Sequence, residues 1–196
     1  MYIKEIFNTH KLPENSYWLN EPESWHSGSG LEIITGRETD FWQRTHYGFR
    51  RDNGHCLLSD YSSDFILTAH ARFEPRSRYD QCGMIVRVDA ENWIKLSTEY
   101  EDEAISRLGS VVTNFGYSDW ATQDVSSSIK QRWYRIVRQG NDFILEASGD
   151  GSNWFQMRIA HLHNAGRTIA AGLYACSPIG EAFRCSFSCL EMESKD

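Results

Sequence analysis

The sequence predicts an all-β protein, a two-sheet antiparallel β-sandwich of the jelly-roll kind, and three observations indicate this fold. Apolar and polar residues alternate with a period of two along most of the chain, and no long segment has the 3.6-residue period of an amphipathic helix. The alternating runs are separated by short clusters of Gly, Asn, Asp and Ser, which form turns. The length of 196 residues and the 40% hydrophobic content suit one domain with a two-layer core.

The alternating runs give the expected strands in chain order. They lie at residues 31–36, 56–58, 64–73, 83–88, 93–100, 107–115, 133–139, 143–148, 155–159, 168–175 and 183–192. The first 30 residues are expected to be an irregular segment that wraps the sandwich or forms an edge. Residues 116–120 are expected to form a loop. We find no boundary between domains and treat residues 1–196 as a single domain.

The middle of the chain gives the clearest prediction. Two alternating runs at residues 83–88 and 93–100 flank a turn at residues 89–92, which predicts an antiparallel hairpin. In the second run, alternation places two sets of side chains on opposite faces of the strand. One set is Ile94, Leu96, Thr98 and Tyr100, and the other is Trp93, Lys95, Ser97 and Glu99.

Charge and hydropathy exclude several classes of protein. The formal net charge is −7 and no sustained run of Lys or Arg occurs, which argues against a nucleic-acid ligand. No segment approaches the run of about 18 apolar residues that spans a bilayer, so no membrane partner is expected. Residues 1–7 carry an acidic side chain and lack a signal-peptide cleavage pattern. The expected compartment is therefore the cytoplasm.

The sequence indicates no metal site and no cofactor. The five cysteines are odd in number and contain no CxxC pair, so we expect buried free thiols. His161 and His163 would share one face of a strand, but a metal needs further ligands and none is evident nearby. The Asp- and Asn-containing segments 89–92 and 150–153 are first of all turns. Phosphate-loop and serine-nucleophile motifs are also lacking.

Three sets of segments resemble a known family. The first is TDFWQRTHYG at residues 39–48 with DNGH at 52–55, and the second is YDQCGMIVR at 79–87 with NWIK at 92–95 and Glu99. The third comprises WYRIVR at 133–138, DGSNW at 150–154 and GLYACSP at 172–178. In this order they resemble the family named after a regulator of enolase, over about residues 15 to 190. The resemblance implies a concanavalin A-like lectin/glucanase fold, but most of that family has no known function, and a fold does not fix a function.

Glu99 is the candidate catalytic residue that the resemblance suggests. Glucanases of this fold class place two carboxylates on one strand, and a retaining pair lies about 5 Å apart. Glu101 and Glu103 continue the alternation of Glu99, but they fall where the chain turns and are expected to form a solvated hairpin tip. Glu99 and Lys95 instead form either the floor of a polar groove or an exposed ion pair. Arg87 lies on the preceding strand, and its side depends on the register.

Aromatic and polar residues outside the expected strands form a second set of candidates. An aromatic ring can stack on the CH face of a pyranose, while carboxylates accept hydrogen bonds from its hydroxyl groups. The alternative is that these rings are packing at the edges of the sandwich. With the groove residues, the candidate ligand-binding set is Trp42, His46, Tyr47, Arg87, Lys95, Glu99, Asp119 and Trp120.

Three functions fit these observations. The first, which we favour, is a carbohydrate-binding or sugar-sensing protein. The second is a glycoside-hydrolase-like enzyme that uses Glu99 and a second carboxylate, which the sequence does not locate. The third is a protein-interaction module, and exposed edge strands also allow a homodimer.

Overall fold

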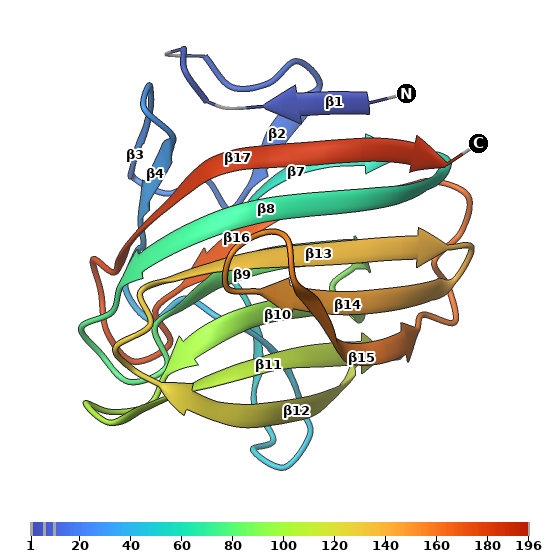
Figure 1. The fold of residues 1–196 in the computed structure, drawn as a ribbon. Helices are drawn as coiled ribbons and strands as arrows, with labels where there is room; N and C mark the ends of the chain where they lie inside the picture. The colour runs from blue at the N-terminus through green and yellow to red at the C-terminus, as the bar shows by residue number, and fades with distance from the viewer. Residues whose placement is uncertain (1, 6, 10, 196) are drawn as a thin grey trace.

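The computed structural model describes residues 2–5, 7–9 and 11–195, and these contain seventeen strands in two large antiparallel sheets and one short ribbon (Figure 1). The eight-stranded sheet has the order β15-β14-β13-β8-β17-β4-β3, with β1 also paired to β17. The seven-stranded sheet has the order β12-β11-β10-β9-β16-β7-β2. Strands β5 and β6 pair only with each other. The predicted all-β sandwich is confirmed, and no helix in the described part of the chain could span a membrane.

The strands have the following bounds, in chain order: β1 Tyr2–Glu5, β2 Ser16–Leu19, β3 Ser24–Ser27, β4 Leu31–Ile34, β5 Phe41–Gln43, β6 Arg50–Asp52, β7 His55–Tyr61, β8 Asp64–Glu74, β9 Gln81–Asp89, β10 Asn92–Tyr100, β11 Ile105–Asn114, β12 Tyr117–Ser126, β13 Gln131–Gln139, β14 Asp142–Ser148, β15 Trp154–His161, β16 Ile169–Cys176 and β17 Arg184–Lys195.

The hairpin of β9 and β10 has the predicted alternation. Ile94 and Leu96 point into the main core between the two large sheets, where they pack with apolar residues of both. Trp93 and Lys95 point to the opposite, outer face of the seven-stranded sheet, yet both are buried. The outer face of this sheet is therefore covered.

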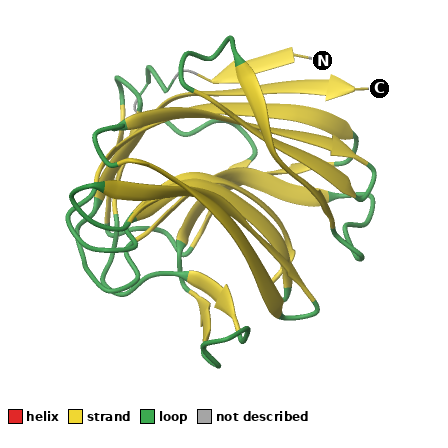
Figure 2. Ribbon diagram, turned by 60° about the horizontal axis from the view of Figure 1, so that its bottom comes forward, coloured by secondary structure: helices red, strands yellow, loops and turns green. Residues whose placement is uncertain are grey.

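A second apolar cluster and the β5–β6 ribbon cover that outer face. Figure 2 shows the small ribbon lying apart from the two large sheets. It contributes Phe41 and Trp42, whose rings pack on side chains from β7, β9, β10, β11 and β16. The members of this cluster are Phe41, Trp42, Cys56, Leu58, Ile85, Trp93, Val111, Tyr174 and Cys176. Burial of this face explains why it carries aromatic and aliphatic residues between its polar ones.

The structure differs from the sequence-based expectation at two edges. The first 30 residues lie at sheet edges, one of the two expected arrangements, but instead of being irregular throughout they contain the short strands β1, β2 and β3, of which β2 and β3 end their sheets. Residues 117–120, expected in a loop, begin β12, because Phe115 and Gly116 form a two-residue turn with φ of 51° and 73°. These edge strands bury few apolar side chains, so they leave only a weak periodic pattern in the sequence.

The five cysteines lie among the described residues, and each is a buried free thiol, as expected. Burial raises the pKa of Cys56, Cys176 and Cys185 above the ordinary range for a thiol. These thiols therefore stay protonated and behave as small apolar side chains of the core.

Replacing Gly172 on β16 with alanine is expected to lower the free energy of unfolding by about 2 kcal/mol. A Cβ atom at Gly172 would overlap the backbone carbonyl of Leu57 on the neighbouring strand, which cannot move without shifting the sheet. Urea denaturation measures the loss. Gly149→Ala is the matched control, because a Cβ there meets no atom within 4 Å, and it should change stability by less than about 0.5 kcal/mol. Equal stability of the two variants would contradict the prediction.

Candidate functional site

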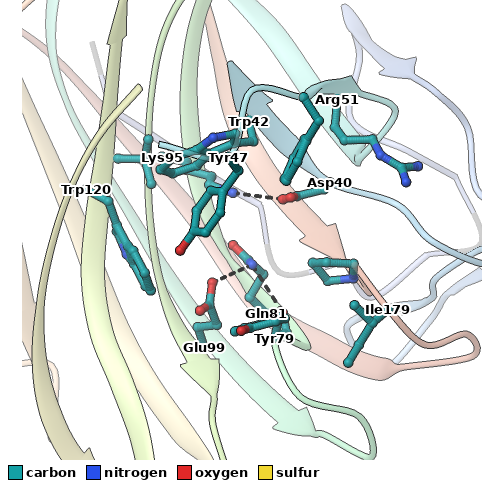
Figure 3. Close-up of a pocket in the computed structure, with 13 residues that line it drawn as sticks. Asp40, Trp42, Tyr47, Arg51, Tyr79, Gln81, Lys95, Glu99, Trp120 and Ile179 are labelled. Atoms are coloured by element: carbon teal, nitrogen blue, oxygen red, sulfur yellow. Dashed lines mark hydrogen bonds and ion pairs between the residues drawn. The ribbon is translucent and has the colours of Figure 1, made fainter. Parts of the chain in front are cut away.

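A pocket of about 420 Å³ opens on the outer face of the seven-stranded sheet. Its floor comes from β9 and β10, and its walls come from the ribbon, from β11 and β12, and from the segments before β9 and after β16. Figure 3 shows Trp120 on one side and Ile179 on the other, with Glu99 and Gln81 between them. The lining residues are Asp40, Trp42, Tyr47, Phe49, Arg51, Tyr79, Gln81, Lys95, Glu99, Val111, Trp120, Pro178 and Ile179.

An ion pair between Lys95 and Asp40 forms one part of the pocket. Lys95 Nζ lies 3.2 Å from Asp40 Oδ1, and the two side chains are only 4% and 14% exposed. Burial lowers the pKa of Lys95, but the negative charge of Asp40, with smaller contributions from other acidic groups, outweighs it and leaves the pKa raised. The ammonium group also lies 5.8 Å and 5.7 Å from the ring centroids of Trp93 and Tyr174. Lys95 therefore remains charged.

Asp40 is held in place by the backbone at the start of the ribbon. Its Oδ1 accepts a hydrogen bond from the backbone N of Phe41 at 2.7 Å. Its own backbone N donates to Asn53 Oδ1 at 3.0 Å, and its carbonyl accepts from the backbone N atoms of Asn53 and Gly54. The turn after β6 thus fixes the carboxylate over β10.

Glu99 lies half-buried beside Gln81 on the neighbouring strand. Gln81 Nε2 donates to Glu99 Oε2 at 2.7 Å, and Tyr174 Oη donates to Gln81 Oε1 at 3.0 Å. Burial raises the pKa of Glu99 to about 8, and the favourable charge of Lys95 only partly opposes this effect. At neutral pH most Glu99 side chains are therefore protonated and can both donate and accept a hydrogen bond.

Aromatic rings surround this polar floor. The ring centroid of Trp42 lies 5.4 Å from that of Tyr47 and 6.5 Å from that of Trp120, both in edge-on arrangements. Trp42 is fixed by a hydrogen bond from its Nε1 to the carbonyl of Thr45 at 3.0 Å. The pocket thus combines apolar ring surfaces with a few oriented polar groups, the usual make-up of a small-molecule site.

The structure brings five of the eight predicted site residues together. Trp42, Tyr47, Lys95, Glu99 and Trp120 all line the pocket. The alternation of β10 explains the joint placement of Lys95 and Glu99. The two tryptophans and Tyr47 meet there because the ribbon folds over the face that β12 extends.

The other three predicted residues do not line the pocket. His46 contacts the ring of Tyr47 edge-on at 4.7 Å. Arg87 shares the outer face but forms two hydrogen bonds of 2.8 Å with Asp52. Asp119 pairs with Arg158 of the other sheet at 2.7 Å. Because Asp119 belongs to a strand rather than a loop, its side chain points away from the face that carries its neighbour Trp120.

Sequence reasoning missed Asp40 and Gln81. Gln81 could have been found, since extending the predicted hairpin by two pairs places it opposite Glu99. Asp40 carries no local signal, because it is 55 residues from Lys95 in the sequence and its position depends on the ribbon.

The acidic segment after Glu99 forms the hairpin tip that was predicted, between β10 and β11. Asp102 accepts hydrogen bonds from the backbone N atoms of Ala104 and Ile105 at 2.8 Å and 2.9 Å, which stabilises the turn. Glu101 pairs with Arg107 at 3.0 Å and also with Arg78. This carboxylate is thus engaged outside the pocket.

The histidines of β15 and the loop after it have protein partners. His161 Nδ1 lies 2.6 Å from Asp142 Oδ1, and the ring of His163 stacks on Phe115 at 5.3 Å. Within the described ranges, no group of three or more His, Cys, Asp and Glu side chains is placed to hold a metal ion. Asp150 accepts hydrogen bonds from the backbone N atoms of Ser152 and Asn153, as expected for a turn.

Comparison with known proteins identifies the family. The family model described as "Protein of unknown function (DUF1349)" matches residues 18–195. The chain belongs to this family. The DUF1349 protein is 33% identical over 172 residues to "Regulation of enolase protein 1" of Saccharomyces cerevisiae, covering 87% of this chain and 85% of the yeast protein. The family resemblance expected from the sequence is thereby confirmed.

Solved structures confirm the sandwich fold. A functionally unknown protein from Saccharomyces cerevisiae matches the DUF1349 protein with a TM-score of 0.86 and 31% identity over 93% of this chain and 97% of that chain. The GH43 protein BlXynB of Bacillus licheniformis matches with a TM-score of 0.78 and 15% identity over 98% of this chain. The DUF1349 protein spans only 39% of BlXynB, and at this identity the likeness shows the fold alone.

Proposed function

We propose that this DUF1349 protein binds a neutral saccharide in the pocket on the outer face of the seven-stranded sheet. The observation that carries the proposal is that Trp42, Tyr47 and Trp120 stand around a floor formed by Glu99 and the Lys95–Asp40 pair. Aromatic rings bind the CH faces of a sugar, and the polar groups of a floor can bind its hydroxyls. The volume of about 420 Å³ is in the range of small-ligand sites.

The hydrogen-bonding capacity of the floor supports a sugar over a purely apolar ligand. Each sugar hydroxyl both donates and accepts a hydrogen bond. A protonated Glu99 has the same dual capacity, and Lys95 has more donor hydrogens than its bond to Asp40 uses. A ligand without hydroxyl groups would leave the hydrogen-bonding capacity that Gln81 and Asp40 do not use at Glu99 and Lys95 without partners, at a cost of about 1–3 kcal/mol for each group left unsatisfied.

The cytoplasm remains the proposed compartment. The five free thiols support it, because such thiols persist in reducing surroundings.

Saccharide binding is tested by thermal shift and titration calorimetry with glucose, galactose, mannose, xylose and arabinose and with their di- and trisaccharides. We expect at least one series to raise the melting temperature at millimolar concentration. Trp120→Ala should weaken binding about tenfold, because it removes a stacking ring worth about 0.5–1.5 kcal/mol together with its apolar contact area. Trp154→Ala is the matched control, since Trp154 lies on the other large sheet and packs on Arg135. Absence of any shift across the panel would overturn the proposal.

A second candidate function is hydrolysis of a glycoside by Glu99 and Asp40. The observation in its favour is that a second carboxylate, Asp40, lines the same pocket as Glu99, whose raised pKa suits a proton donor. The same protein–saccharide mixtures are therefore analysed by chromatography. Products formed by the wild type but not by Glu99→Gln or Asp40→Asn would favour the enzyme over the binding protein.

A further inference from the structure

Two aromatic rings at the mouth of the pocket lie open to solvent. Tyr47 and Phe49 belong to the loop between β5 and β6, and they are 54% and 44% exposed. Their rings stack on each other with centroids 5.8 Å apart and planes 20° apart. Both also line the pocket, so the exposed ring surface continues directly from its interior.

The loop that carries these rings is held firmly. The backbone N of Gly48 donates to the carbonyl of Arg44 at 2.7 Å, and the backbone N of Arg44 donates to the carbonyl of Phe49 at 2.9 Å. Arg44 also donates from its guanidinium to the carbonyl of Gly116 at 2.8 Å, which ties the loop to the turn between β11 and β12. Arg44 and His46 adopt left-handed φ angles of 52° and 63°, a conformation that surrounding contacts must stabilise.

The rings form a continuous series from the interior to the surface. Trp120 and Trp42 are adjacent in the pocket, Trp42 contacts Tyr47, and Tyr47 stacks on Phe49. Trp42 is only 8% exposed, whereas the two outer rings are about half exposed. A ligand that fills the inner part and extends outward would therefore pass along Tyr47 and Phe49.

Polar contacts engage the two arginines next to these rings. Arg50 forms an ion pair with Glu91, and Arg51 donates to the carbonyl of Glu38 at 3.2 Å. Arg51, whose partner is a neutral carbonyl, keeps its positive charge at the mouth of the pocket, and Tyr47 and Phe49 add flat apolar ring surface beside it. Such a surface suits the CH face of a second neutral sugar ring.

We propose that Tyr47 and Phe49 form a second subsite, so that the pocket takes the end of a neutral oligosaccharide and the next sugar residue stacks on this ring pair. The inference rests on the proposed function and deepens it, because it names the ligand class as an oligosaccharide. Since the rings are held in place before binding, little ordering cost opposes the second contact.

The test compares affinities along one saccharide series, such as xylose, xylobiose and xylotriose, taken from the series with the largest thermal shift. In the wild type we expect the disaccharide to bind at least tenfold more tightly than the monosaccharide. In the double variant Tyr47→Ala/Phe49→Ala the ratio of the two affinities should fall to about one.

A second variant, Tyr47→Leu/Phe49→Leu, keeps apolar bulk without flat rings and should give the same low ratio. Phe115→Ala is the control, because Phe115 is exposed but does not line the pocket, and it should keep the wild-type ratio.

The outcomes separate the two proposals. A monosaccharide that binds as tightly as its disaccharide, or a wild-type ratio that survives in both double variants, overturns the second subsite alone. A protein that binds no saccharide of any length overturns the proposed function and the subsite with it. A wild type that dimerises in sedimentation velocity while the double variants stay monomeric assigns the rings to contact between two copies and also overturns the subsite.

Discussion

Replacing Lys95 with methionine is expected to lower the free energy of unfolding by about 3–5 kcal/mol, the usual cost of leaving one partner of a buried ion pair uncompensated. Methionine keeps the apolar stem of lysine but removes the charge that faces Asp40 at 3.2 Å. The Asp40 carboxylate, whose side chain is only 14% exposed, then lacks its counter-charge. Urea denaturation at neutral pH measures the change.

The double variant Asp40→Asn/Lys95→Met is the matched control for this prediction. With both charges removed, the pocket contains no buried unpaired ion, and we expect the double variant to regain more than half of the lost stability. If Lys95→Met alone costs no more than about 0.5 kcal/mol, as a surface substitution does, the ion pair does not stabilise the fold.

Replacing Glu99 with glutamine is expected to stabilise the protein more at pH 8 than at pH 4.5. In the unfolded chain this carboxyl ionises near its ordinary value of 4.5, whereas in the folded protein its pKa is about 8. Between these values the unfolded state gives up the proton and the folded state keeps it, so wild-type stability falls as the pH rises. One pKa unit corresponds to about 1.4 kcal/mol. Allowing for the partial exposure of Glu99, we expect a gain of about 3 kcal/mol at pH 8.

Urea denaturation across this pH range measures the effect of Glu99→Gln. Glu103→Gln, at the exposed tip of the same hairpin, is the matched control and should change stability by less than about 0.5 kcal/mol at each pH. A stability difference between Glu99→Gln and the wild type that is the same at pH 4.5 and pH 8 would contradict the assigned pKa.

The sequence predicted most of the sandwich and part of the pocket, because both depend on local alternation. The shared face of Lys95 and Glu99 follows from the period of two along β10. That this face is buried could not be predicted, because its cover comes from the β5–β6 ribbon, far away in the sequence. Asp40 was missed for the same reason.

Asp119 and Arg87 show how small structural differences change a prediction about a site. Asp119 was expected in a loop beside Trp120, but after the two-residue turn at Phe115 and Gly116 the strand β12 begins within that expected loop and places these neighbours on opposite faces. Arg87 lies on the expected strand, yet its partner Asp52 comes from the ribbon. Both outcomes depend on where distant strands dock, which periodicity within one strand does not encode.

The position of β17 determines how the chain can fold. Although β17 is the last strand in the sequence, it lies inside the eight-stranded sheet, where it pairs with β8 on one side and with β4 and β1 on the other (Figure 1). Until residues 184–195 have been synthesised, β8 exposes an unpaired edge, and the early strands β1 and β4 lack their main neighbour. Nascent chains with such edges can associate with one another. Completion of this sheet therefore has to wait for the synthesis of β17, and the high sequence separation of the pairing predicts slow folding.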